Sequence, residues 1–260
     1  YDISYRIELE TLEDYFEGLV IEDPQMEMNF DLTIHVQAQD YKPYPVVVLE
    51  DGKYILRMME WGLISKGMTT PELIKERRST MCNARSERIV IDEESAWYGL
   101  RNQRCLIPVN GIFEHRGITD KKKKYPYYIR LKDRPIFCLP GLYNYSPGFG
   151  KDKKPVGSFT IITRTANEIM RQIHNDGENA FRMPLFLPKE LELKWLQPGL
   201  NDLEIQQVLD FEMPSESLEY HTVFRIRGKK EHPTGGLKTD QFMWPDMPPL
   251  GVDTSQQSLF

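Results

Sequence analysis

Apolar residues recur along the first quarter of the chain with two different periods. In residues 9–19, leucine and aromatic side chains stand three or four positions apart, which predicts an amphipathic helix. Two β-rich runs, 44–50 and 53–64, flank the pair Asp51-Gly52, a strong signal for a hairpin turn. The pattern therefore predicts a helix followed by an antiparallel pair of strands.

The middle of the chain has the pattern of strands separated by turns. Residues 104–116 predict a strand with a bend at Asn110-Gly111. Residues 127–145 predict a second hairpin, with its turn around residues 133–135. Both segments are rich in residues that favour strands, so we expect much of the core to be sheet.

Five short helices are expected besides the first. One follows a buried strand in residues 156–173, and Thr165 is its expected N-cap. The other four are expected after Pro71 and at residues 93–101, 189–196 and 201–210.

These elements predict an α+β fold, with a mainly antiparallel, barrel-like sheet flanked by short helices. Regular β-α alternation is absent, as are GxGxxG and GxxxxGK[ST], so a Rossmann or P-loop fold is not expected. The composition shifts only at the end, where residues 229–260 are rich in glycine, proline and polar side chains. We expect one domain, 1–228, followed by an extended C-terminal tail, 229–260.

Composition narrows the class of protein. Of the 260 residues, 40% are hydrophobic and 28% are charged, as in a folded globular protein. The net charge of −6 argues against indiscriminate binding to nucleic acid, although a local basic groove is compatible with it. No apolar run approaches the length of a membrane span, the start lacks a signal-peptide pattern, and the three cysteines have no CxxC spacing. We expect a cytoplasmic monomer, nucleoid-associated if bacterial, with no membrane partner and free thiols.

The stretch "STMCNARSER", residues 79–88, concentrates polar groups in an unusual way. A strand here would send Asn83, Arg85 and Glu87 to one face. Burying an amide and two charges together is costly unless they are paired or touch a ligand. The alternative is a solvated edge strand with an internal ion pair.

Two further residues are candidates for acid–base chemistry. Glu114 follows an uncharged strand, and burial there is expected to raise its pKa toward the neutral range in which a general acid or base works. Its alternative is an ion pair with Arg116 or with a lysine of a neighbouring strand. His174 ends an expected helix, whose C-terminus favours the imidazolium form. Its alternative is a simple helix cap.

Candidates for binding nucleic acid lie elsewhere. In "FRIR", Arg225 and Arg227 share one face of an expected strand, while Phe224 and Ile226 face the core. Trp61 is most simply a core residue, and its alternative is a platform on which a base stacks. The five histidines form no HExxH motif, and neither a paired CxxC nor a GxSxG elbow is present, so we expect no metal, no cofactor and no serine hydrolase.

Taken together, five windows resemble the SOS-response-associated peptidase family in both sequence and order. They are "EWGLI", "NARSE", "RCLIPVNGIFEH", "FTIITRTAN" and "IHNDGENAFRMPLFL", and the resemblance covers about residues 1–225. Members of that family shield abasic sites in single-stranded DNA as part of the DNA damage response.

The resemblance implies a barrel-like fold with a positively charged groove for single-stranded DNA. It also implies an autopeptidase that exposes an N-terminal cysteine, and a lyase-like, DNA-crosslinking activity of that cysteine. Its amine and thiol attack the aldehyde of an abasic site and form a thiazolidine. In this chain the cysteine is expected directly before Tyr1.

The resemblance also implies roles for individual residues. Glu114 would hold or deprotonate the amine, His174 would act as an acid on the sugar oxygen, and Asn83 would position the nucleophile. Arg85 would bind a phosphate, and Thr163 matches the threonine of the family's strand-to-helix turn. We count Trp61, Arg225 and Arg227 with Arg85 and Thr163 as DNA-binding candidates.

The sequence departs from the family after His174, where residues 175–181 are an insertion. Two other functions stay open at this point. One is a non-covalent module for single-stranded DNA or RNA, in which Glu114 and His174 only support the fold. The other is a metal-dependent hydrolase that uses the same two residues, which the ligand spacing disfavours.

Overall fold

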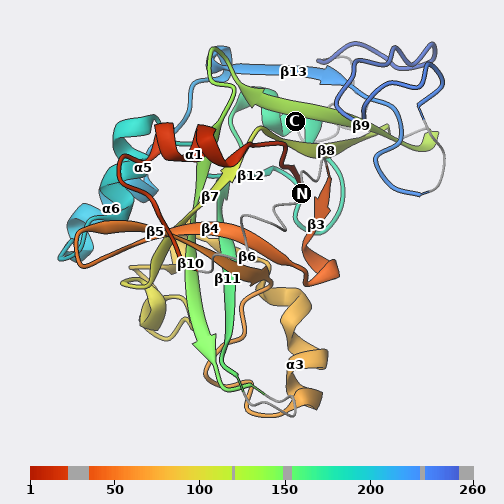
Figure 1. Cartoon of the computed structure of the whole chain (residues 1–260). Helices are drawn as coiled ribbons and strands as arrows, with labels where there is room; N and C mark the ends of the chain where they lie inside the picture. The colour runs from red at the N-terminus through yellow and green to blue at the C-terminus, as the bar shows by residue number, and fades with distance from the viewer. Residues whose placement is uncertain (23–34, 119–120, 149–153, 229–231, 252–260) are drawn as a thin grey trace.

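The computed structural model describes residues 1–22, 35–118, 121–148, 154–228 and 232–251. This part of the chain contains thirteen strands and five α-helices. Figure 1 shows how they are arranged. The strands are β1 (Asp2–Ser4), β2 (Val20–Ile21), β3 (Val36–Gln37), β4 (Pro43–Glu50), β5 (Lys53–Trp61), β6 (Asn83–Arg85), β7 (Arg104–Val109), β8 (Gly111–Ile118), β9 (Lys121–Leu131), β10 (Phe137–Ser146), β11 (Val156–Thr165), β12 (Arg182–Pro184) and β13 (Leu218–Thr222). The helices are α1 (Leu9–Tyr15), α3 (Pro71–Arg77), α4 (Glu168–Ile173), α5 (Lys189–Leu196) and α6 (Asp202–Leu209).

The strands form two sheets. The smaller has the order β13-β9-β8-β1-β3, and the larger has the order β12-β11-β10-β7-β4-β5-β2, with β6 paired to β11. Because β11 also pairs with β5, the strands β11, β10, β7, β4 and β5 form a ring. The α+β prediction is confirmed, and the sheets form a ring-like arrangement rather than a true barrel. Most pairings are antiparallel, as predicted, while β5, β6 and β2 include parallel ones.

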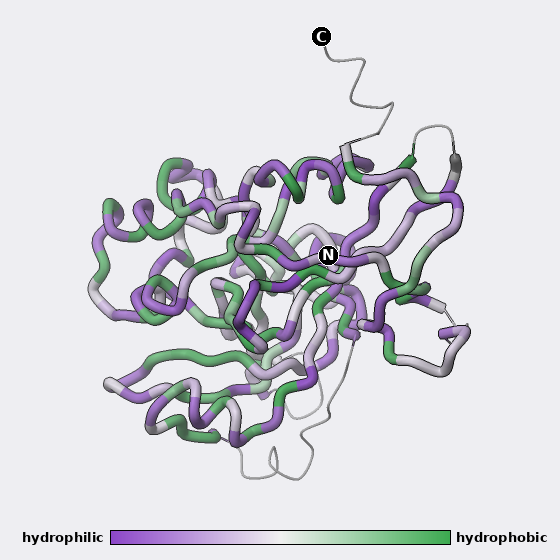
Figure 2. Tube along the Cα trace, turned by 90° about the horizontal axis from the view of Figure 1, so that it is seen from above, coloured by the Kyte–Doolittle hydropathy of each residue, from purple (hydrophilic) through white to green (hydrophobic). Residues whose placement is uncertain are grey.

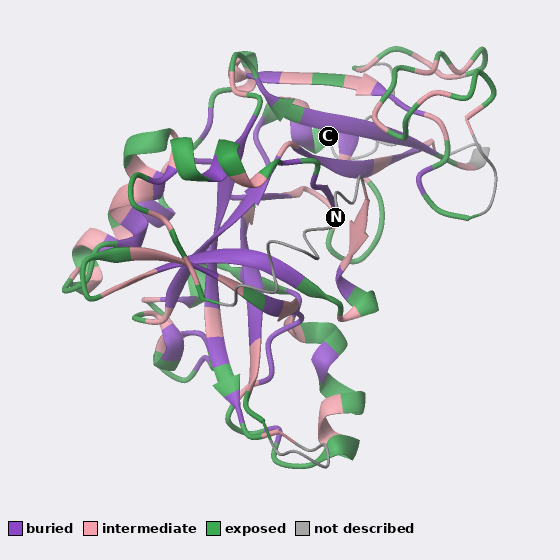
Figure 3. Cartoon of the chain, in the orientation of Figure 1, coloured by how far each residue is buried: buried purple, intermediate pink, exposed green. Residues whose placement is uncertain are grey.

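The core lies where the two sheets and the flanking helices meet. Figure 2 shows apolar positions interleaved with polar ones along the chain, and Figure 3 shows the long central strands buried while much of α1 and α3 is exposed. Phe113, Phe137, Phe159 and Phe186 are among the largest fully buried side chains. Within the described residues, no helix is long and apolar enough to cross a membrane.

The bend predicted at Asn110-Gly111 is confirmed, and it carries the chain from the larger sheet to the smaller one. β7 ends at Val109 in one sheet and β8 begins at Gly111 in the other. A Cβ atom on Gly111 would lie 2.5 Å from the Tyr128 ring, so only glycine fits there. This crossing delivers Glu114, three residues later, to the middle of the smaller sheet.

The two predicted hairpins have opposite outcomes. β4 and β5 do form a hairpin, in which Asp51 and Gly52 both adopt the left-handed backbone of a type I′ turn, with φ of 48° and 75°. The hairpin predicted around residues 133–135 is wrong. β9 pairs with β8 and β13, whereas β10 pairs with β7 and β11, so the turn there also links one sheet to the other.

Most predicted helices are present, with three corrections. The helices after Pro71 and near 189–196 and 201–210 are confirmed, but the first helix ends at Tyr15. Residues 93–101 contain only a short 3₁₀ turn, Tyr98–Leu100, and the Ser95 hydroxyl accepts from the Trp97 nitrogen instead. Helix α4 is capped by Asn167 and not by Thr165, because β11 continues to Thr165.

The described part of the C-terminal segment, 232–251, folds back on the smaller sheet. Trp244 stacks on Phe224 at 5.7 Å between ring centroids, and its indole nitrogen donates to the Val223 carbonyl. The fully buried Arg116 guanidinium donates to the carbonyl oxygens of Pro248 and Pro249. Of these partners, Arg116 lies on β8, two residues after Glu114, while Val223 and Phe224 follow β13.

We predict that Trp244→Ala lowers the free energy of unfolding by about 2 kcal/mol, because it removes a packed aromatic ring and a hydrogen bond. The neighbouring Met243 side chain, which is 75% exposed, is the matched control. Met243→Ala should change stability by less than about 0.5 kcal/mol. Urea unfolding measures both, and equal stability of the two variants would mean that the segment does not contribute to the fold.

Candidate functional site

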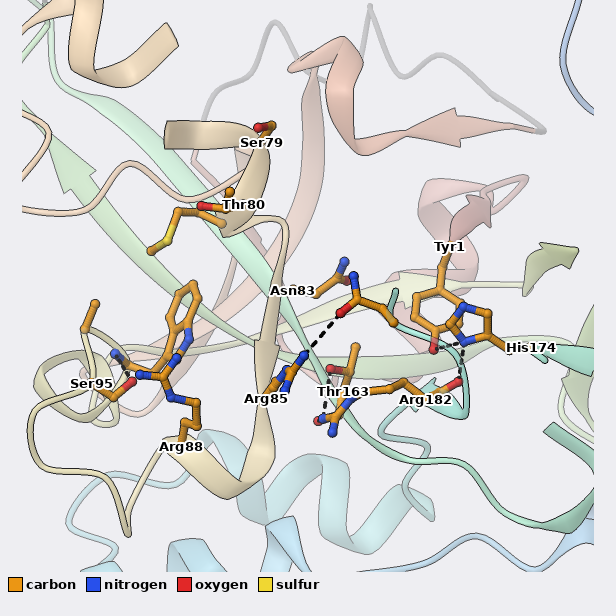
Figure 4. A pocket seen from close by; sticks show the side chains of 14 residues that line it. Tyr1, Ser79, Thr80, Asn83, Arg85, Arg88, Ser95, Thr163, His174 and Arg182 are labelled. Carbon is orange, nitrogen blue, oxygen red and sulfur yellow. Dashed lines mark hydrogen bonds between the residues drawn. The ribbon is translucent and has the colours of Figure 1, made fainter. Parts of the chain in front are cut away.

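A cavity of about 680 Å³ opens between the two sheets, on the side of β6 and β12 (Figure 4). Polar and basic side chains dominate its wall. Tyr1 and His174 lie at one end, Asn83 and Arg85 lie along the middle, and Ser95 and Arg88 lie toward the other end. The other lining residues are Ser79, Thr80, Met81, Ala96, Trp97, Thr163, Asn179 and Arg182.

Strand β1 brings the start of the chain to this cavity. It pairs with β8 in a register that sets Asp2 opposite Phe113 and therefore Tyr1 beside Glu114. Asp2 is 1% exposed, and its carboxylate accepts from His35 Nε2 at 2.7 Å and from Arg227 at 2.6 and 2.9 Å. Burial alone would raise the pKa of Asp2, but these hydrogen bonds outweigh it and hold that pKa well below its usual range.

Glu114 has one satisfied oxygen and one unsatisfied oxygen. Its side chain is buried, and Oε1 accepts from the backbone nitrogen of His115 at 2.7 Å. Oε2 is buried without a hydrogen bond among the described residues. That oxygen lies 4.0 Å from the Tyr1 backbone nitrogen and 3.9 Å from His174 Nε2. A buried carboxylate oxygen without a hydrogen bond lowers the stability of the fold, so it is expected to have a role in binding a ligand or transferring a proton. The alternative of an ion pair with Arg116 is not observed, since Arg116 binds the C-terminal segment.

His174 directly follows α4, as its sequence position predicts, and its orientation is fixed by what its Nδ1 contacts. Nδ1 lies 2.8 Å from the Arg182 carbonyl oxygen and 3.0 Å from the Tyr1 hydroxyl. A carbonyl oxygen can only accept, so Nδ1 carries the proton. In the neutral ring, Nε2 is then left with a lone pair facing Glu114.

The strand predicted in residues 79–88 is shorter than expected. Only Asn83–Arg85 is strand, and it lies parallel to β11, with Asn83 and Arg85 exposed to the cavity and Ala84 buried. Glu87 is in a 3₁₀ turn and pairs with Arg182 of β12 rather than with a local arginine. Neither expectation for this stretch, a buried polar strand or a solvated edge strand, is correct. Its polar side chains form one wall of the cavity.

Three arginines line the cavity, and their partners differ. Arg182 binds both oxygens of Glu87, and it also donates to the Thr163 carbonyl and hydroxyl. Arg88 pairs with Asp92. Arg85 has no acidic partner among the described residues, and it donates only to the amide oxygen of Asn179 at 3.2 Å. Its charge is therefore the one least neutralised by the protein.

Three of the predicted DNA-binding residues do not reach the cavity. Trp61 is 1% exposed, its ring stacks on Phe159, and its nitrogen donates to the Cys82 carbonyl. Its simplest interpretation as a core residue is confirmed, and the alternative of a base-stacking platform is wrong. The strand predicted at "FRIR" is also wrong, because β13 ends at Thr222. Arg225 lies outside the cavity lining, and Arg227 is bound to Asp2.

The structure adds residues that the sequence reasoning did not select. Tyr1 and Arg182 form the contacts of His174, and Asn179, from the insertion 175–181, holds Arg85. The triplet "RMP" after the insertion was the one available signal for Arg182. Nothing in the sequence pattern marks Tyr1 or Asn179, since each is defined only by long-range contacts.

The internal cysteines are unsuited to act as nucleophiles. Cys82, Cys105 and Cys138 are 3% exposed or less. Burial raises the pKa of the Cys82 thiol to about 11, and it raises the pKa values of the other two further. Within the described residues, no three His, Cys, Asp or Glu side chains come together as metal ligands.

Comparisons with known proteins identify relatives that match most of the chain. Residues 6–227 match the profile of the SOS response associated peptidase (SRAP) family. The abasic site processing protein YoqW of Bacillus subtilis is 32% identical over 184 residues, which cover 68% of this chain and 74% of YoqW. The abasic site processing protein YoaM of the same organism is 31% identical over 207 residues, which cover 75% of this chain and 83% of YoaM.

A solved structure agrees with these sequence matches. A crystal structure of a protein from Bacteroides thetaiotaomicron superposes with a TM-score of 0.75 and 28% identity, over 86% of this chain and 91% of that one. A protein from Bordetella bronchiseptica, at 18% identity, superposes with a TM-score of 0.68 over 85% of this chain and 98% of that one, and it shares the fold.

We predict that Asp2→Asn lowers the free energy of unfolding at pH 7 by about 2 kcal/mol, because it weakens the charge-assisted hydrogen bonds that His35 and Arg227 donate to the buried carboxylate. The pKa of Asp2 falls on folding, so the stabilisation is complete above the unfolded-state pKa of about 3.9 and is lost as the pH falls below it. The difference between the two proteins should therefore be constant from pH 7 to 5 and narrow below pH 4.

Urea unfolding at several pH values tests this expectation. Asp92→Asn is the control, because Asp92 pairs with Arg88 but is far more exposed than Asp2, and it should cost less than about 1 kcal/mol. A difference for Asp2→Asn that does not change with pH would mean that the charge of Asp2 is not what stabilises β1.

Proposed function

The chain belongs to the SOS response associated peptidase family, and from this premise we propose that it binds single-stranded DNA and crosslinks itself to abasic sites. The relatives YoqW and YoaM are abasic site processing proteins, and we extend that role to this chain. The single observation that carries the proposal is the buried, unpartnered Oε2 of Glu114, close to both the Tyr1 nitrogen and His174.

The proposed nucleophile is a cysteine joined directly to Tyr1. A residue attached to the Tyr1 nitrogen would have its own α-amine within a few ångströms of Glu114, because consecutive Cα atoms are about 3.8 Å apart. Its thiol would be near the mouth of the cavity, unlike the buried internal thiols. We propose that the autopeptidase activity of the family exposes this amine.

The proposed reaction proceeds in two steps. The α-amine, whose reference pKa is about 7.7–8.0, loses a proton to Glu114 and attacks the C1′ aldehyde carbon of the opened sugar. The carbinolamine loses its hydroxyl group as water, with a proton from His174, and leaves an iminium ion. The thiol sulfur then adds to the iminium carbon and its proton returns to His174, which closes the neutral thiazolidine ring.

The remaining wall of the cavity would hold the DNA. Arg85 is the least neutralised charge in the cavity and would contact a phosphate. The amide of Asn83, which forms no hydrogen bond with another described residue, would orient the nucleophile or the sugar. Thr163 lines the same wall, but its hydroxyl already donates to the Ala84 carbonyl, so we propose for it a supporting role.

We predict that Glu114→Gln leaves the protein folded but slows crosslinking to abasic single-stranded DNA by about 10²- to 10⁴-fold, the usual contribution of a general base. The side chain keeps its size and loses only its capacity to take a proton. The defect should lessen as the pH rises past about 8, where the amine loses its proton unaided. A time course of adduct formation on denaturing gels, at several pH values, measures this.

A thermal melt run beside the time course separates chemistry from stability. Glu219→Gln is the matched control and should react at the wild-type rate. It changes an exposed glutamate that pairs with Arg130 at the edge of the smaller sheet. If Glu114→Gln reacts at the wild-type rate but melts at a lower temperature, Glu114 is a structural residue.

We predict that Arg85→Ala weakens binding to single-stranded DNA for all base sequences alike. Losing one phosphate contact should reduce the slope of log K against log salt concentration by about 0.7. Fluorescence anisotropy with a labelled oligonucleotide, measured at several salt concentrations, gives the slope.

Arg77→Ala is the control for this measurement, because Arg77 is an exposed arginine on α3 outside the cavity. Its slope should equal that of the unmodified protein. If the slope for Arg85→Ala is also unchanged, the role of Arg85 is to hold the insertion through Asn179.

A further inference from the structure

Tyr1 contacts the reaction centre with both its backbone and its side chain. Its backbone nitrogen lies 4.0 Å from Glu114 Oε2, while its hydroxyl lies 3.0 Å from His174 Nδ1. The ring packs edge-on against the imidazole, with centroids 5.1 Å apart and planes at 64°. The side chain is only 5% exposed, so the ring fills that end of the cavity (Figure 4).

The direction of the hydrogen bonds follows from the partners. Because Nδ1 donates its proton toward the Arg182 carbonyl, the Tyr1 oxygen can only share that same proton as a second acceptor. Burial, and then the nearby Glu114 carboxylate, raise the pKa of Tyr1 well above its usual value, so the hydroxyl keeps its own proton. Two oxygens thus converge on one N–H group and fix both the tautomer and the tilt of the ring.

We propose that Tyr1 is a positioning residue that orients His174 so that Nε2 faces Glu114 and the reacting sugar. The expected effect on the reaction rate rests on the proposed function. The contacts between Tyr1 and His174 do not depend on it. Since the proposed nucleophile is joined to the Tyr1 nitrogen, one residue sets the positions of both the attacking amine and the acid.

The hydrogen bond between the Tyr1 hydroxyl and His174 has a chemical consequence at the imine-forming step. An imidazolium that delivers a proton from Nε2 is stabilised when Nδ1–H has good acceptors, as in other sites where an oxygen fixes the second ring nitrogen. Without the Tyr1 oxygen, one acceptor remains, the Arg182 carbonyl, and the ring can tilt away from Glu114. The loss should therefore appear in the reaction rate and not in DNA affinity.

The test is Tyr1→Phe, which keeps the ring and removes only the oxygen. At saturating abasic DNA, the rate of adduct formation should fall about tenfold, the size expected for one hydrogen bond to a charged group, while the Kd for DNA stays unchanged. Tyr145→Phe, which removes a hydroxyl from a half-exposed tyrosine outside the cavity lining, should have no effect. Intact mass of each variant checks that the same N-terminus is present.

A second measurement needs no DNA. In proton NMR spectra of the protein with ¹⁵N-labelled histidine, the Nδ1–H signal of His174, assigned by its disappearance in His174→Gln, should shift in Tyr1→Phe and exchange faster with solvent. An unchanged signal together with a wild-type rate would overturn the proposal. If the unmodified protein forms no adduct but the signal responds as expected, the proposed function fails and the positioning role stands.

Discussion

The buried carboxylate of Asp2 is the interaction on which the rest of the site depends. A three-residue strand at the start of a chain has few contacts of its own, and β1 is held in the smaller sheet by pairing with β8 and β3. Asp2 adds the hydrogen bonds from His35 and Arg227, which lie far apart in the sequence. With β1 fixed in register, the Tyr1 nitrogen lies next to Glu114, and the Tyr1 side chain reaches His174.

One crossing of the chain between the sheets and one pair of strands in the larger sheet place the other functional groups. The bend at Asn110-Gly111 carries Glu114 into the smaller sheet, while β11 and β12 of the larger sheet bring Thr163 and Arg182 to face it. The site therefore lies where the sheets meet, and it is assembled from segments that no single motif contains. Residues 175–181 also contribute to this arrangement, since they connect His174 to Arg182, whose carbonyl His174 contacts, and Asn179 binds Arg85.

The sequence pattern correctly predicted those turns and helices whose formation depends on neighbouring residues. The Asp51-Gly52 turn and the helices after Pro71 and Asn201 depend on nearby residues, and all three are present. Strand partners depend on the whole chain, so the alternation in residues 127–145 identified two strands but assigned them wrongly to one hairpin. In the same way, alternation in "FRIR" could not reveal that Arg227 binds Asp2, whereas Trp61 is buried, as its simplest interpretation predicted. Local patterns and the family windows both select Asn83, Arg85, Glu114 and His174, but only the fold brings them together.

The central claim is that the residue joined to the Tyr1 nitrogen reacts with abasic DNA beside Glu114 and His174. The most direct test is to incubate the protein with an oligonucleotide containing one abasic site, digest both polymers, and sequence the modified peptide by mass spectrometry. The account predicts a sugar-phosphate remnant on a cysteine immediately before Tyr1, stable without chemical reduction. A remnant on an internal lysine, or no covalent product at all, would contradict it.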